Sequence, residues 1–139
     1  MKIDTSLVDR LRRQAVEAAS RSYSPYSRFP VGAAVVSRNG SIYAGCNVEN
    51  ASFGLTQCAE RAALTTAIAA GEQPGDLVCL VIYIPGDARH PPCGACRQVM
   101  RELMSPDSRV YSFGDGEAYR VWSADEYLPD PFTPESLLR

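Results

Sequence analysis

The stretch LVCLVIYI, residues 77–84, is a continuous apolar run with the length of one β-strand. A strand with one solvated face alternates apolar and polar residues, whereas a strand covered on both faces is apolar throughout. The run therefore predicts a central strand that lies between two covering layers.

The segments on either side of this run supply further strands. Upstream, residues 31–37 and 41–47 have strand-like composition and flank Asn39-Gly40, a strong signal for a short hairpin turn. Downstream, short β-like runs at residues 110–113 and 119–122 predict two more strands.

Three segments have the character of helices. Apolar residues recur at helical spacing in residues 4–22 and 96–104, the latter expected to stop at Ser105-Pro106, while residues 58–70 are apolar nearly all round and should be buried. The order helix, two strands, helix, strand, helix, two strands predicts an α/β fold. We expect a three-layer α/β/α sandwich around a mixed five-stranded sheet.

Size and charge limit what such a protein does. A chain of 139 residues fits one domain, here residues 1–139, with one sizeable core. The net charge of −2 leaves no surplus of cations for a polynucleotide backbone, so a nucleic-acid partner is not expected.

Neither a basic-then-apolar leader nor an apolar run of roughly 20 residues is visible, so we expect no membrane association and a cytoplasmic protein. The odd number of cysteines argues against a disulfide framework and suggests metal binding. The five are Cys46, Cys58, Cys79, Cys93 and Cys96.

Two motifs together suggest a metal site. Cys58-Ala59-Glu60 is followed by Pro92-Cys93-Gly94-Ala95-Cys96, which gives three thiol ligands and one nearby carboxylate. Structural zinc normally has four protein ligands, whereas catalytic zinc has three and keeps its fourth position for water. We therefore predict one catalytic Zn²⁺ per chain, bound by Cys58, Cys93 and Cys96.

The spacing of these residues restricts where they lie. Residues two apart in mid-helix point to nearly opposite sides, so Cys58 should lie at a helix start from which Glu60 can reach the ion. Cys93 and Cys96, three apart near the next helix start, share one face. Helix N-termini favour thiolates, and Arg61 and Arg97 are candidates to withdraw density from the sulfurs.

Plainer interpretations remain open for several of these residues. Cys93 and Cys96 fit a thiol-redox pair or, like Cys46 and Cys79, buried small side chains. His90 has no adjacent ligand and is better explained as a polar loop residue than as a fourth ligand.

Four stretches of the chain resemble the cytidine deaminase family, in its short, three-cysteine zinc form. They are FPVGAA at 29–34, NVENAS at 47–52, CAER at 58–61 and PCGACRQ at 92–98, and the likeness runs from about Ser24 to the tail. The resemblance implies hydrolytic deamination of cytidine and 2′-deoxycytidine in pyrimidine salvage. It also implies that zinc activates a water and that Glu60, as the catalytic residue, accepts its proton while C4 of cytosine is attacked.

The same resemblance assigns substrate contacts. Phe29 would pack against the pyrimidine, Asn47 and Glu49 would hold the ribose 3′-hydroxyl, and Ala59 would also bind substrate. A core position for Phe29 and a solvated strand-end position for Glu49 are the alternatives. Phe53 stands where the family commonly has Tyr, so a hydrogen bond from that hydroxyl is absent.

The family's short members are homotetramers whose sites are completed by a Phe from a neighbouring subunit's tail. Residues 128–132, LPDPF, resemble that tail, so we expect a homotetramer with Phe132 in an intersubunit site. Three other functions share part of this pattern: a deaminase of another cytosine compound such as blasticidin S, a polynucleotide-editing deaminase, and a structural zinc or thiol-redox module. The NVEN motif, the acidic balance and Glu60 argue against these in turn.

Overall fold

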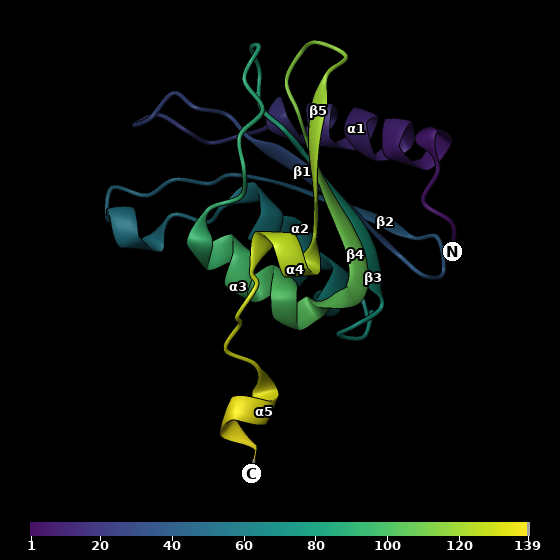
Figure 1. Cartoon of the computed structure of the whole chain (residues 1–139). Coiled ribbons are helices and arrows are strands. Elements are labelled where there is room, and N and C mark those ends of the chain that lie inside the picture. Colours follow the sequence, from purple (N-terminus) through teal and green to yellow (C-terminus); the bar gives the residue numbers. More distant parts are fainter. Residues whose placement is uncertain (139) are drawn as a thin grey trace.

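The computed structural model describes residues 1–138, and over that range five strands form one sheet in the order β2-β1-β3-β4-β5 (Figure 1). β1 is antiparallel to β2 and β3, β3 is parallel to β4, and β4 is antiparallel to β5, so the sheet is mixed as predicted. The strands span Gly32–Ser37 (β1), Ile42–Cys46 (β2), Leu77–Tyr83 (β3), Met104–Phe113 (β4) and Tyr119–Ser123 (β5).

Helices cover both faces of this sheet, which confirms the three-layer sandwich. Helix α1 (Thr5–Ala19) packs on one face, while α2 (Ala59–Ala69), α3 (Gly94–Leu103) and the short α4 (Ala124–Tyr127) lie on the other (Figure 1). Each face has its own apolar cluster, because alternate strand residues point to opposite sides.

The central strand β3 follows the prediction closely. All of its residues are buried, and Leu80 and Ile82 join the cluster under α2 and α3 while Val81 and Tyr83 join the cluster under α1. In register, Val81 pairs with Ala34 of β1. Because β3 contributes to both apolar clusters, its side chains on both faces of the sheet have to be apolar.

Glycines allow two helices to approach the sheet closely. A Cβ on Gly32 of β1 would lie 1.8 Å from the main-chain oxygen of Ala15 in α1. A Cβ on Gly45 of β2 would lie 2.6 Å from the main-chain nitrogen of Ala63 in α2. The backbones of α1 and α2 therefore pack directly against the backbones of β1 and β2 at these two glycines.

Several boundaries differ from the predictions. Helix α1 ends at Ala19, three residues earlier than expected, and α3 begins at Gly94, two residues earlier, because Cys93 is its N-cap. Helix α3 ends at Leu103, before Ser105-Pro106 as predicted, but these two residues already belong to β4, which begins at Met104 and not at residue 110. Proline is tolerated near the start of a strand, where the missing N–H is not needed for the ladder.

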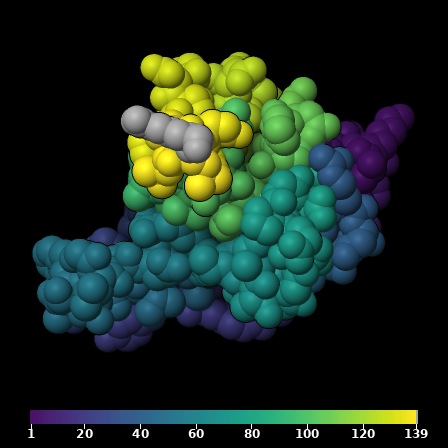
Figure 2. Space-filling view, turned by 90° about the horizontal axis from the view of Figure 1, so that it is seen from below, coloured from purple at the N-terminus to yellow at the C-terminus, as the bar shows by residue number. Residues whose placement is uncertain are grey.

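The tail after α4 leaves the body of the molecule. It ends in α5 (Pro134–Leu137), a short helix that was not predicted and that lies away from the sheet (Figure 1). Figure 2 shows this tail on the outside and the segment around residues 48–57 as a projecting lobe. Within residues 1–138, each helix is too short or too polar to cross a membrane.

Candidate active site

Two helix N-termini bring three cysteines together. Cys58 is the N-cap of α2 and Cys93 is the N-cap of α3, with Cys96 in the first turn of α3. The three sulfurs lie within 4.8 Å of one another, and the Cys58 and Cys93 sulfurs are 3.8 Å apart. The predicted position of Cys58 at the helix start is confirmed, and this donor set fits a zinc ion with three protein ligands.

Hydrogen bonds concentrate negative charge on one of these sulfurs. The Cys96 thiol and the Arg61 guanidinium both donate to Cys58, and they lower the pKa of Cys58 to about 5. The pKa of Cys96 is raised by the same sulfur contact and by burial. Nη2 of Arg61 is 3.3 Å from the Cys58 sulfur, so a cation faces the cluster.

Arg97 lies elsewhere. Its Nε donates to the carbonyl oxygen of Pro92 at 2.7 Å and its Nη1 to that of Tyr127 at 3.4 Å, and not to a ligand sulfur. Successive helical residues are turned by about 100°, so a residue directly after Cys96 points away from the sulfurs. Arg97 instead ties the main chain before Cys93 to the end of α4.

Glu60 lies in the first turn of α2, next to the cysteine cluster. Its side chain lines the same cavity as Cys58 and Cys93, and the residue is only 6% exposed. Burial raises the pKa of the Glu60 carboxyl above its ordinary value. A buried carboxyl with a raised pKa is suited to accept and return a proton near neutral pH.

The cavity beside the cluster has a volume of about 320 Å³, at the small end for a ligand pocket. Its wall contains the remaining predicted substrate residues except Phe132, because Phe29, Asn47, Glu49 and Ala59 all line it. The structure thus joins the FPVGAA and NVEN stretches to the cysteine motifs.

His90 also belongs to this wall, which the sequence did not indicate. Its ring packs edge-on against Phe29, with centroids 5.3 Å apart. The one feature of the sequence that could have indicated a place for His90 in the cavity wall is its position three residues before Cys93. Other pocket residues are Ser27, Val31, Thr56, Ile82, Ile84 and Pro91.

Asn47 holds the chain on both sides of Pro30. Its Nδ2 donates to the carbonyl oxygen of Phe29 at 2.8 Å, and its Oδ1 accepts the N–H of Val31 at 2.9 Å. The Ser22 hydroxyl donates to the same Oδ1. Asn47 therefore fixes the backbone of the residue proposed to pack against the base.

Glu49 holds the preceding turn. Its Oε1 accepts the N–H groups of Tyr26 and Ser27 at 2.9 and 3.1 Å, and its Oε2 accepts the Ser27 hydroxyl. These bonds lower the pKa of Glu49, with the Ser27 hydroxyl as the main cause. The carboxylate remains ionised at the rim of the cavity.

Phe132 lies outside its own chain's cavity. It is 57% exposed, and its carbonyl oxygen accepts a hydrogen bond from Nε2 of Gln98 at 2.7 Å.

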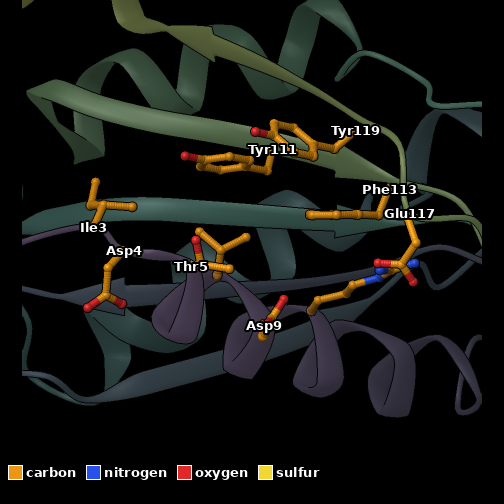
Figure 3. A pocket seen from close by; sticks show the side chains of 10 residues that line it. Ile3, Asp4, Thr5, Asp9, Tyr111, Phe113, Glu117 and Tyr119 are labelled. Carbon is orange, nitrogen blue, oxygen red and sulfur yellow. The ribbon is translucent and has the colours of Figure 1, made fainter.

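A second hollow of similar size lies on the opposite side of the sheet. Figure 3 shows Tyr111, Phe113 and Tyr119 of β4 and β5 facing α1 residues such as Thr5 and Asp9. It shares no residue with the cysteine cavity and contains no cysteine among its described lining residues, so it lacks the proposed chemistry.

Comparison with known proteins decides the family. Residues 5–112 match the model of the cytidine and deoxycytidylate deaminase zinc-binding region. The chain belongs to this deaminase family. The matched residues include the three cysteines and Glu60, and the three-cysteine cluster is therefore the metal site that the zinc-binding region of such deaminases leads one to expect.

Individual deaminases are similar over nearly their whole length. The cytidine deaminase of Halalkalibacterium halodurans is 44% identical over 91% of this chain and 95% of its own, and that of Mycobacterium tuberculosis is 46% identical over 93% and 92%. The crystal structure of cytidine deaminase from Burkholderia pseudomallei superposes with a TM-score of 0.85 at 46% identity, covering 89% of this chain and 98% of that one. The predicted fold and family are confirmed.

Proposed function

We propose that this deaminase hydrolyses cytidine and 2′-deoxycytidine to uridine and 2′-deoxyuridine, with release of ammonia. The observation that carries the proposal is the convergence of the three-cysteine cluster and buried Glu60 on one cavity that also contains Phe29, Asn47 and Glu49. Metal chemistry, a proton carrier and groups that fit a base and a sugar thus meet in one place.

Cys58, Cys93 and Cys96 would hold the zinc. Zinc with three protein ligands supplies a Lewis acid that lowers the pKa of water. Arg61 offsets the negative charge of the thiolates through its bond to Cys58. Arg97 keeps the main chain before Cys93 in place.

Glu60 moves the protons of the reaction. It takes one proton from the water whose oxygen forms the new bond to C4 of cytosine, and it delivers a proton to N3. It then takes the proton of the hydroxyl now on C4 and delivers it to the 4-amino group, so that the C4–O bond becomes a carbonyl, the C4–N4 bond breaks and ammonia leaves. Water and cytidine are consumed, and uridine and ammonia are formed without a change of oxidation state.

The remaining groups orient the nucleoside. Phe29 offers an aromatic face to the pyrimidine, and the Ala59 N–H, in the first turn of α2, is free of an intrahelical acceptor and suits a base carbonyl. Asn47 retains a second amide hydrogen and Glu49 retains lone pairs on Oε2, so the two fit the donor and acceptor of a 3′-hydroxyl.

Charge favours a free nucleoside over a nucleotide. The ionised Glu49 carboxylate at the sugar end would repel a phosphate bonded there. The net charge of −2 likewise fits a small substrate and not a nucleic acid. We place the enzyme in pyrimidine salvage, as one catalytic domain in the reducing cytoplasm, where metal-binding thiols stay reduced.

We further propose a homotetramer whose sites are completed by Phe132 of a neighbouring subunit. Support comes from large apolar side chains that the single chain leaves exposed. Phe53 and Leu55 in the projecting segment around residues 48–57 are 75% and 70% exposed, and Leu137 and Leu138 in the tail are 71% and 76% exposed. Exposed apolar clusters of this kind mark interaction sites.

The first experiment follows the ultraviolet absorbance of cytidine and 2′-deoxycytidine with purified protein, with zinc measured on the same sample. Loss of the cytosine band with about one zinc per chain is expected for a three-ligand catalytic site. Turnover of blasticidin S without turnover of cytidine or 2′-deoxycytidine would show that the proposed substrates are wrong. Bound zinc without turnover of any cytosine compound would point to a noncatalytic module.

A further inference from the structure

We propose that Ser27 is a positioning residue that couples recognition of the sugar to packing of the base. The inference rests on the proposed function, because it concerns how Glu49 and Phe29 are presented to a nucleoside. Ser27 has no assigned role, although it lines the cavity between these two residues.

One hydroxyl joins the two halves of the site. Oγ of Ser27 donates its hydrogen to Oε2 of Glu49 and accepts the N–H of Phe29 at 3.0 Å. A serine hydroxyl has one donor and two acceptor sites, so both bonds can exist together. A shift of the carboxylate is therefore transmitted through one atom to the backbone of Phe29.

Ser27 also decides which oxygen of Glu49 faces the substrate. Oε1 is already occupied by the N–H groups of Tyr26 and Ser27, and Oε2 is fixed in direction by the Ser27 hydroxyl. Without that hydroxyl, Oε2 would lose the one donor that it has within residues 1–138, and the carboxylate could rotate. The oxygen proposed to accept the 3′-hydroxyl would then be poorly placed.

The turn that Ser27 closes contains a strained residue. Arg28 has a φ of +56°, in the left-handed region that residues with a side chain rarely adopt. The bond from the Phe29 N–H to Oγ of Ser27 spans Arg28, and the Arg28 N–H is itself bonded to the carbonyl oxygen of Ser24 at 2.9 Å. Such local side-chain bonds hold backbone that would otherwise relax, which would move Phe29.

The test compares Ser27→Ala, Ser27→Thr and Ser24→Ala on cytidine and 3′-deoxycytidine. Ser24 lies in the same loop, and its hydroxyl is hydrogen-bonded to the Ser22 hydroxyl without touching Glu49 or Phe29. A hydrogen bond to a carboxylate is worth about tenfold or more, so the wild type should prefer cytidine by kcat/KM at least about tenfold. Ser27→Ala should reduce this preference about fivefold or more.

The threonine variant should restore the preference to within about twofold, because it keeps the hydroxyl, and Ser24→Ala should behave as wild type. An unchanged preference in Ser27→Ala, even with a raised KM for both substrates, would overturn the proposal, because a merely structural role affects both substrates equally.

Amide hydrogen exchange tests the same idea without turnover. The N–H of Tyr26 is bonded to Glu49 and that of Phe29 to Ser27. Exchange at both amides should accelerate in Ser27→Ala, and exchange at neither should accelerate in Ser24→Ala. Equal rates in the two variants would overturn the positioning role. Should the wild type fail to deaminate cytidine, the proposed function falls, and this measurement still decides whether Ser27 holds Glu49.

Discussion

Nη2 of Arg61 donates a hydrogen bond to the sulfur of Cys58 across 3.3 Å. The two residues are three apart, at the N-cap and in the first turn of α2, so local helix geometry is enough to bring them together. Three thiolates bring more negative charge than a divalent ion neutralises, and the guanidinium offsets part of that excess.

Replacing Arg61 with Ala should therefore weaken zinc binding or lower kcat/KM by about tenfold to a hundredfold, the range for outer contacts of metal ligands. Zinc affinity by competition with a chelator, together with steady-state kinetics, would measure both effects. Arg10→Ala, at an exposed position of α1, is the control and should change neither. If zinc affinity and kcat/KM are both unchanged in Arg61→Ala, the contact with Cys58 stabilises neither the bound zinc nor the transition state.

Glu60→Gln should lower kcat by about 10²-fold to 10⁴-fold while zinc content stays near one per chain, because the amide cannot carry the proton. Zinc should stay because the three thiols are untouched. Metal analysis and single-turnover rates on the same preparation would separate the two properties. The exposed Glu102→Gln serves as control, and normal turnover in Glu60→Gln would remove this residue from the mechanism.

Phe132→Ala should raise the KM for cytidine about tenfold, the amount expected for the loss of one aromatic contact, if the tail completes a neighbour's site. Mixing Phe132→Ala chains with Glu60→Gln chains should restore sites of low KM. A site that takes Glu60 from a Phe132→Ala chain and Phe132 from a neighbouring Glu60→Gln chain has both residues intact. Sedimentation should give a tetramer. A monomer at micromolar concentration, or a mixture without restored sites, would contradict the shared site.

Asp115 should make stability depend on pH. The hydroxyl of Tyr83 and the N–H of Gly86 donate to its carboxylate, and the Tyr83 bond is the main reason that the pKa of Asp115 lies below its ordinary value of 3.8. A lowered folded-state pKa gives stability that is present above the ordinary pKa and lost as pH falls through the folded one.

The wild type should therefore unfold at a higher urea concentration than Asp115→Asn at pH 7. The two midpoints should converge in acid, below about pH 4. Asp87→Asn, in the same loop as Gly86 and exposed, should follow the wild-type curve throughout. A constant difference from pH 7 to pH 2 would show that the charge of Asp115 is not involved.

Gly32→Ala should destabilise the protein by about 3 kcal/mol, because the new methyl group meets backbone of α1 and cannot be accommodated by a rotamer change. Chemical unfolding would measure the loss. Gly54→Ala adds a methyl group where nothing lies within 4 Å, and it should change stability little. Equal stabilities would mean that α1 can move away from β1 at little cost.

The central part of the fold could be predicted because burial on both faces leaves a uniform apolar pattern at β3. The C-terminal part could not. The first residues of β4 include Ser105 and Ser108, which are polar yet almost fully buried, so composition gave no sign of a strand. Helices α4 and α5 have four residues each, too few to show a helical period.

Each half of the metal cluster could be predicted because its geometry is local: Cys58 lies at one helix start, and Cys93 and Cys96 lie at the next with helical spacing. That the two halves, 35 residues apart, bind one ion followed from the number and type of their ligands. The loop around Ser27 could not be predicted in the same way. Its bond to Glu49 joins residues 22 apart, and no periodicity relates them. The edge contact of His90 with Phe29 likewise depends on the assembled fold.

Cys58 and Cys93, which cap α2 and α3, are 35 residues apart, and the segment between them contains all of α2 and β3. An ion held by both closes this segment into a loop around the middle of the sheet, as a disulfide would, and so restricts the unfolded chain. Unlike a disulfide, this crosslink dissociates when the ion is withdrawn. Metal supply should therefore govern how long the folded chain survives as well as how fast it turns over substrate.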